Sequence, residues 1–217
     1  MNTNVDLPKL IEVARERSSD DAAHDFSHVQ RVLQNARLIL RETKADSDIV
    51  LAAVALHELF NYPKGHPESS KSGDVCAQMA SEVLVAQGFP EDKLPLVLTC
   101  IRFHSFSRGI VPDFIEAKIV QDADRLDAIG AIGIARCFAT TAQMGRPFYN
   151  LSDPFGTART LNDKEYGLDH FYVKLLRLAD GMHTQTGRRI AEQRTLFMER
   201  YLEQFRLEIG WRNPTEE

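Results

Sequence analysis

Four residues of the sequence are of the types that bind metal ions: His28, His57, Glu58 and Asp124. His57 and Glu58 follow an apolar run over residues 49–56, which is long and apolar enough to form a buried helix. Polar groups at the end of such a helix must be solvated, paired or coordinated, because an unpaired buried charge is costly. Imidazole and carboxylate groups suit a divalent transition ion, or Mg²⁺ or Mn²⁺ with open water positions. Such an ion activates a bound water.

Each of these residues also has an alternative role that needs no metal. His28 could occupy an ordinary polar position on an amphipathic helix, and Glu58 could pair with a lysine. Asp124 could form an ion pair with Arg125 or Arg136. The metal hypothesis requires separate helices to bring these side chains to a common point. The adjacent pair must then flank the ion at a helix end or in a cleft, because neighbouring helix residues point about 100° apart.

The elements expected to position these side chains are helices. Apolar residues recur at helical spacing, whereas the alternating runs typical of strands are almost absent. The predicted helices span residues 7–17, 26–43, 49–60, 75–87, 94–103, 114–127, 128–144, 169–182 and 186–209. We therefore predict an all-α protein, a compact bundle of roughly eight or nine helices. Ser47 and Asp48 are expected to cap the third helix, and Gly88 to end the fourth.

The length of 217 residues suits one domain, which we place over residues 1–217 with its core at 22–209. Residues 145–166 form a long segment without helical periodicity, and we regard this segment as a candidate lid. The cysteines, Cys76, Cys100 and Cys137, are far apart in the sequence. They are expected to be reduced core residues, because no Cys-x-x-Cys pair exists.

Composition excludes several classes of protein. The net charge of −5 comes from mixed charges, which argues against a dedicated nucleic-acid surface but allows a local basic pocket. No apolar stretch approaches the ~18 residues of a membrane helix. The polar N-terminus lacks the features of a signal peptide, so a cytoplasmic location is expected. The sequence does not fix the oligomeric state and is compatible with a homodimer.

Several segments resemble the HD-domain superfamily of metal-dependent phosphohydrolases, all-α proteins named for a His-Asp doublet. The order of His28, His57-Glu58 and Asp124 is similar to the family's ligand order. The similarity to a subgroup of small bacterial HD hydrolases extends over residues 24–32, 63–64, 103–107, 120–136, 169–175 and 184–188. The segment around Asp124 is the most specific of these matches. The doublet departs from the pattern, because Glu58 stands where the family has Asp.

The resemblance implies that a divalent ion (Mn, Mg, Co, Ni, Fe or Zn) is held by His28, His57, Glu58 and Asp124. It implies hydrolysis of a phosphate ester or anhydride, with a nucleotide, such as a nucleoside triphosphate cleaved to release pyrophosphate, as the substrate. Asp127 lies one turn after Asp124 and is a candidate to support the ligands from outside. Two alternatives stay open: a catalytically weakened HD protein that binds nucleotide or metal as a sensor, and a helical protein that binds only a partner.

Phosphate charge requires cationic or donor groups beside the metal. Lys64 and His66 lie in the loop after the doublet, His104 ends a predicted helix, and Arg125 follows Asp124. These residues are the candidate catalytic groups. Lys64 and His104 are preferred for contact with substrate. His66 could protonate the leaving group, since an imidazole has a pKa near 6.5, about the working pH of an enzyme.

Overall fold

The computed structural model describes residues 6–17, 26–62, 66–105 and 108–212. Over these residues it contains nine α-helices, three short 3-10 helices and no strand. This confirms the predicted all-α class and the expected number of helices. By internal contacts the chain divides into two compact units, residues 1–127 with 183–187, and residues 128–182 with 188–217.

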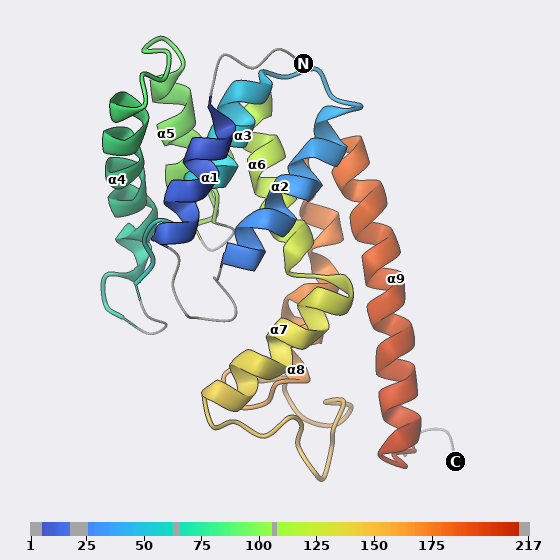
Figure 1. Cartoon of the computed structure of the whole chain (residues 1–217). Coiled ribbons are helices and arrows are strands. Elements are labelled where there is room, and N and C mark those ends of the chain that lie inside the picture. The colour runs from blue at the N-terminus through green and yellow to red at the C-terminus, as the bar shows by residue number, and fades with distance from the viewer. Residues whose placement is uncertain (1–5, 18–25, 63–65, 106–107, 213–217) are drawn as a thin grey trace. The chain divides into compact units, whose positions relative to one another are not determined.

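The first unit is built around helix α3 (Ser47–Leu56), in which every residue from Asp48 to Leu56 is buried. It lies among four helices, each of which it contacts (Figure 1): α1 (Leu7–Glu16), α2 (Phe26–Leu40), α5 (Leu94–Arg102) and α6 (Ile115–Asp127). Helix α4 (Ser72–Ala86) packs on α5. A helix that is apolar on all sides belongs at the centre of such a bundle, because no face of it is suited to water.

Both ends of α3 differ from the sequence prediction. The N-cap is Asp46, whose side chain accepts hydrogen bonds from the backbone N–H groups of Asp48 and Ile49. The prediction of Ser47 and Asp48 as caps is therefore wrong. The helix ends at Leu56 and does not reach residue 60. The His57-Glu58 doublet consequently lies in the turn after the helix.

Helix α4 begins at Ser72, directly after a 3-10 turn at Ser69–Lys71, so it starts earlier than predicted. Gly88 follows its end with φ of 66°, a conformation that glycine adopts without steric cost. The predicted stop at Gly88 is confirmed. Near the other end of the helix, a methyl group on Gly73 would collide with the carbonyl oxygen of Arg102. Helices α4 and α5 therefore approach each other there as closely as a glycine allows.

Residues 183–187 belong to the first unit although they lie far along the sequence. Asp122 of α6 is fully buried and accepts hydrogen bonds from the backbone N–H of His183 (2.9 Å) and of Thr184 (2.8 Å), and from the Thr184 hydroxyl (2.7 Å). A Cβ atom on Gly187 would lie 2.6 Å from the Asp122 carboxylate, so only glycine fits there. The Asp122 carboxylate thus holds the start of α9 (Gln185–Glu208).

The second unit contains α7 (Gly130–Gln143), α8 (Asp169–Val173) and residues 188–208 of α9. The predicted helix over residues 169–182 is wrong. Helix α8 stops before Lys174, whose φ of −133° is not helical, and two 3-10 turns follow at Leu175–Arg177 and Ala179–Gly181. The helix predicted over residues 128–144 begins at Gly130 and is separate from α6.

Residues 145–166, the candidate lid, contain no helix, but side chains hold their path. The Asp153 carboxylate accepts hydrogen bonds from the backbone N–H groups of residues 157, 158 and 159. Arg159 then makes two hydrogen bonds of 2.6 Å to the fully buried carboxylate of Asp169. The segment therefore has a defined internal structure. Among the described residues, no helix is long and apolar enough to cross a membrane.

Candidate metal centre

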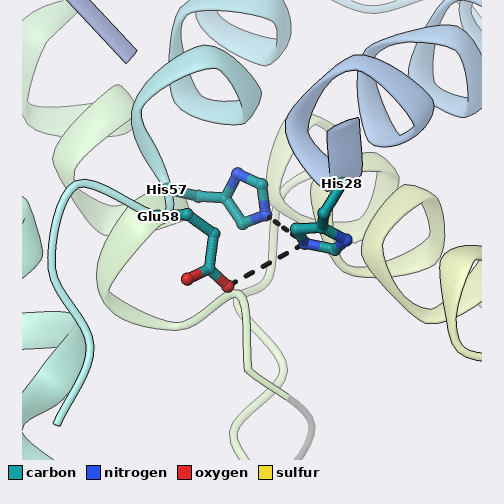
Figure 2. A group of neighbouring side chains, drawn as sticks. All are labelled: His28, His57 and Glu58. Carbon is teal, nitrogen blue, oxygen red and sulfur yellow. Dashed lines mark hydrogen bonds and ion pairs between the residues drawn. The ribbon is translucent and has the colours of Figure 1, made fainter. Parts of the chain in front are cut away.

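In the first unit the ligand atoms of His28, His57 and Glu58 lie within 4.8 Å of one another, and Asp124 lies beside both histidines. The Nε2 atom of His28 lies 3.2 Å from Nε2 of His57, 3.4 Å from Oδ1 of Asp124 and 3.9 Å from Oε1 of Glu58. Figure 2 shows both imidazoles and the Glu58 carboxylate turned toward one another. The Asp124 carboxylate lies 3.8 Å from Nε2 of His57. Residues from α2, α6 and the turn after α3 therefore share one small volume.

These separations match those of ligands around one dication. Two nitrogens bound at about 2.0–2.1 Å lie about 2.8–3.4 Å apart for ligand angles of about 90–110°. The two histidine Nε2 atoms, 3.2 Å apart, fall in this range. His28 and His57 are almost fully buried, and the Glu58 side chain is 8% exposed. Asp124 is the most open of the four, with 23% of its side chain exposed, which leaves a side from which water or substrate can approach.

The other ring nitrogen of each histidine is held by an oxygen. Nδ1 of His57 lies 2.7 Å from the carbonyl oxygen of Val54, and Nδ1 of His28 lies 2.7 Å from Oδ2 of Asp127. A carbonyl can only accept, so Nδ1 of His57 carries the proton and donates it. The Asp127 carboxylate likewise accepts a hydrogen bond from Nδ1 of His28. Both rings therefore present Nε2 to the cluster, the nitrogen that a metal would take.

Arg31 fixes the carboxylate behind His28. Its Nε donates to Oδ1 of Asp127 at 2.6 Å and its Nη2 donates to Oδ2 at 3.0 Å. This two-point contact places a positive charge against Asp127 and sets the plane of its carboxylate. Asp127 supports His28 from outside, as the sequence suggested. Arg31 was missed, although His28 and Arg31 are three residues apart on α2 and therefore share a face.

The two imidazoles differ in charge. Burial lowers the pKa of His28, but hydrogen bonds with Asp124 and Asp127 outweigh it and raise this pKa to about 9. Burial lowers the pKa of His57 to about 4, so this ring is neutral at pH 7. Burial would raise the pKa of Asp124, but its hydrogen bond with His28 and the nearby charge hold it well below its usual value. A proton on His28 thus supplies the positive charge that the surrounding carboxylates require.

His104 is a third imidazole beside this cluster. Its ring is perpendicular to that of His57, with 5.1 Å between the centroids. Its Nδ1 lies 2.6 Å from the carbonyl oxygen of Ile101 in the last turn of α5, so Nδ1 donates and Nε2 is left for another group. His104 is half-buried. Its position beside His57 suits contact with a group bound at the cluster.

The remaining candidates lie elsewhere or outside the described residues. Lys64 is not among the described residues. The His66 ring stacks on Tyr62 at 4.5 Å, and its Nδ1 accepts a hydrogen bond from the Glu68 backbone. Arg125 is 7% exposed, with Nη2 bonded to Gln121 and Nη1 3.0 Å from Nε2 of His183. The catalytic roles of these residues stay predictions.

Comparison with known proteins places this arrangement in a family. The profile of the HD domain matches residues 25–129. The protein YpgQ of Bacillus subtilis is 37% identical over 199 residues, which cover 88% of this chain and 87% of YpgQ. A crystal structure of an HD-superfamily hydrolase from Bacillus thuringiensis is 33% identical and covers 95% of this chain, with a TM-score of 0.73. The chain belongs to the HD-domain superfamily.

Two of the structural relatives are named as HD-superfamily hydrolases, one of them as a predicted hydrolase. YpgQ has also been crystallised in complex with ADP. That structure is 34% identical to this chain, covers 94% of it and 97% of its own length, and has a TM-score of 0.72. In this chain, the residues at the position of the family's doublet are His57 and Glu58. The turn after α3 places both of them next to His28 of α2.

Proposed function

We propose that this HD protein is a metal-dependent phosphohydrolase that cleaves a phosphate ester or anhydride of a nucleotide, with nucleoside triphosphates as the first substrates to test. The proposal rests above all on two buried histidine Nε2 atoms, 3.2 Å apart, beside the carboxylates of Glu58 and Asp124. Two buried imidazoles that face each other beside two carboxylates form a donor set that suits a divalent ion. The ADP complex of YpgQ supports a nucleotide as the ligand.

The residues present fit a divalent ion held by His28, His57, Glu58 and Asp124. Such an ion supplies an activated water and an electrophile for a phosphoryl oxygen. The protein contributes orientation, because Asp127 and the Val54 carbonyl hold the Nδ1 protons and so fix both rings. Exclusion of water on the buried side strengthens every charge interaction at the site.

Phosphate charge would be met by donors on the open side of the cluster. His104 has Nδ1 engaged with Ile101 and can direct Nε2 to a phosphoryl or leaving-group oxygen. Lys64 is expected to neutralise charge that develops on the phosphate. Glu58 is one methylene longer than the Asp of the usual doublet. Its place in the turn after α3 means that helical geometry does not fix its backbone, so the turn can set the longer side chain at the cluster.

The test is a screen of nucleoside mono-, di- and triphosphates with Mn²⁺, Mg²⁺, Co²⁺, Ni²⁺, Fe²⁺ or Zn²⁺, together with elemental analysis of the purified protein. His57→Ala and Asp124→Ala should each lower metal content and reduce hydrolysis more than about 100-fold. His170→Ala, in the second unit, replaces a histidine that pairs with Asp163 and should leave metal content and the rate of hydrolysis unchanged. Hydrolysis that survives both ligand substitutions would refute the proposal.

A second function is favoured by one observation, the Glu in the doublet. A misplacement of about 1 Å can cost on the order of 100-fold in rate. The protein would then bind nucleotide or metal as a sensor without turnover. This alternative predicts tight binding of a nucleotide without product, and a gain of hydrolysis in Glu58→Asp. If wild type turns over and Glu58→Asp is slower, the sensor function is excluded.

A further inference from the structure

The turn that carries the doublet is held by a sulfur atom of another helix. Cys76 lies in the second turn of α4 and is fully buried. Its Sγ lies 3.1 Å from the carbonyl oxygen of His57 and 3.3 Å from that of Leu56. One side chain of α4 therefore touches the backbone of a candidate metal ligand.

The end of a helix leaves its last carbonyl groups without partners, and a buried end must satisfy them in another way. At the end of α3 the Cys76 thiol donates to two of these oxygens. Burial raises the pKa of the Cys76 thiol to about 12, so the sulfur keeps the proton that it donates. Its contacts with the carbonyl groups of residues 56 and 57 hold the start of the turn, next to Glu58.

Helix α4 can act as a support because its own position is fixed close by. Gly73, one turn before Cys76, packs so tightly on the Arg102 carbonyl that a methyl group would not fit. Asp74 adds ion pairs to Arg102 (3.0 Å) and Arg108 (3.2 Å). The same end of α5 carries the Ile101 carbonyl that orients His104. The start of α4 therefore contacts both the turn of His57 and the helix end next to His104.

We propose that Cys76 is a positioning residue of the metal centre, which holds the backbone of His57-Glu58 at the distance from His28 and Asp124 that one ion requires. This inference rests on the proposed function. Loss of the thiol would leave the His57 carbonyl without this donor and the Leu56 carbonyl with the Leu59 N–H at 3.4 Å, and the turn would relax to find other donors. The ligands would then be present but misplaced, and metal affinity would fall while the fold is retained.

The other two cysteines provide matched controls. Cys100 is buried in α5, and Cys137 of α7 lies 3.5 Å from the carbonyl oxygen of Gly167 in the second unit. Cys100→Ala and Cys137→Ala therefore remove a buried thiol of the same size from a different place. Cys76→Ser keeps a donor on a shorter bond and should restore part of the affinity that Cys76→Ala loses.

The experiment measures the affinity of the folded, metal-stripped protein for Co²⁺ and Mn²⁺ by competition with a chromophoric chelator. The absorption spectrum of bound Co²⁺ and the Tm are recorded for each variant. Cys76→Ala should weaken binding about 10–100-fold and alter the Co²⁺ spectrum, whereas both control variants should stay within about twofold of wild type. Cys76→Ser should fall between Cys76→Ala and wild type.

The outcomes separate this inference from the proposed function. If wild type binds metal and Cys76→Ala binds it equally well with an unchanged spectrum, the positioning role is refuted and the hydrolase proposal stands. If Cys76→Ala does not fold, Cys76→Ser decides the question, and an affinity equal to that of the controls with a wild-type spectrum refutes the role. If wild type binds no divalent ion, the proposed function fails and this inference fails with it.

Discussion

Each unit of the protein contains a buried aspartate that is held by an arginine. In the first unit Arg31 contacts Asp127, and in the second unit Arg159 contacts Asp169, in both cases through two nitrogens. Asp169 also accepts a hydrogen bond from the Asn162 backbone at 2.6 Å. The charge of Asp169 is thus matched by Arg159 and by the Asn162 backbone, and the contact organises the loop that carries them.

Asp127 is matched by Arg31 and still faces an imidazole. Nε2 of His28, on the other side of that ring, points at a second imidazole and two carboxylates. The charge of this cluster is balanced by the proton of His28 or by an ion that takes its place. The comparison teaches that a buried acid–arginine pair alone does not mark a site. The imidazoles and carboxylates gathered beyond the pair do.

The largest expected effect is on stability in the second unit. Arg159→Met leaves the buried charge of Asp169 without its main partner and should lower the free energy of unfolding by about 3–5 kcal/mol. Metal affinity should not change. Urea unfolding and chelator competition measure the two quantities. Arg177→Met, at an exposed arginine of the same unit, is the matched control and should cost less than about 0.5 kcal/mol. A loss of metal affinity in Arg159→Met would contradict the comparison.

The equivalent change in the first unit should act on metal binding. Asp127→Asn removes the charge that holds Nδ1 of His28 and should weaken binding of Co²⁺ or Mn²⁺ about 10–100-fold. Asp163→Asn, which removes the partner of His170 in the second unit, serves as the control and should have no effect on affinity. Equal affinities of Asp127→Asn and wild type would show that Asp127 is as purely structural as Asp169.

Metal affinity should depend on pH through His28. The raised pKa, about 9, means that below this pH an ion must displace a proton from His28. Affinity should therefore increase about tenfold per pH unit from pH 6.5 toward 9 and then level off. In the metal-free protein the sign for stability is opposite: the contribution of His28 is complete below pH 6.5 and is lost as pH rises through about 9. Calorimetry in buffers of different ionisation enthalpy counts the released proton, and release of none contradicts the prediction.

The smallest effect is expected in the loop of the second unit. Hydrogen bonds from the backbone of residues 157–159 hold the pKa of Asp153 below its usual value, despite the opposing effect of burial. Asp153→Ala should lower stability by about 1 kcal/mol, since these bonds are near water. Measurement of KM and Tm tests the candidate lid as well. A raised KM with an unchanged kcat would support a lid, and a change in Tm alone would support a structural loop.

Much of the fold could be predicted from the sequence, because apolar periodicity reports which face of each helix is buried. The errors lie where a local contact overrides that pattern. Asp46 replaces the predicted caps of α3 because its carboxylate reaches two backbone N–H groups. The helix predicted over residues 169–182 breaks at Lys174, whose backbone leaves the helical region, although the apolar pattern continues past it.

The sequence predicted the candidate ligands of the site but not the residues that hold those ligands in place. His28, His57, Glu58 and Asp124 stand out because their residue types match a chemistry. Cys76 does not stand out, because sequence spacing indicates only that it is buried. Its contact with His57 depends on how closely two helices approach. That distance is set by tertiary packing, and it cannot be predicted from the periodicity of a single sequence.

The contact between Asp122 and residues 183–184 has a consequence for how this protein can be dissected. The match to the HD profile ends at residue 129, which looks like a natural place to truncate a recombinant fragment. Such a fragment would lack the hydrogen-bond donors of His183 and Thr184 and would strand a buried acid beside the candidate centre. The first unit is discontinuous in sequence, and a soluble minimal version of it must carry residues 183–187 joined back by a designed linker.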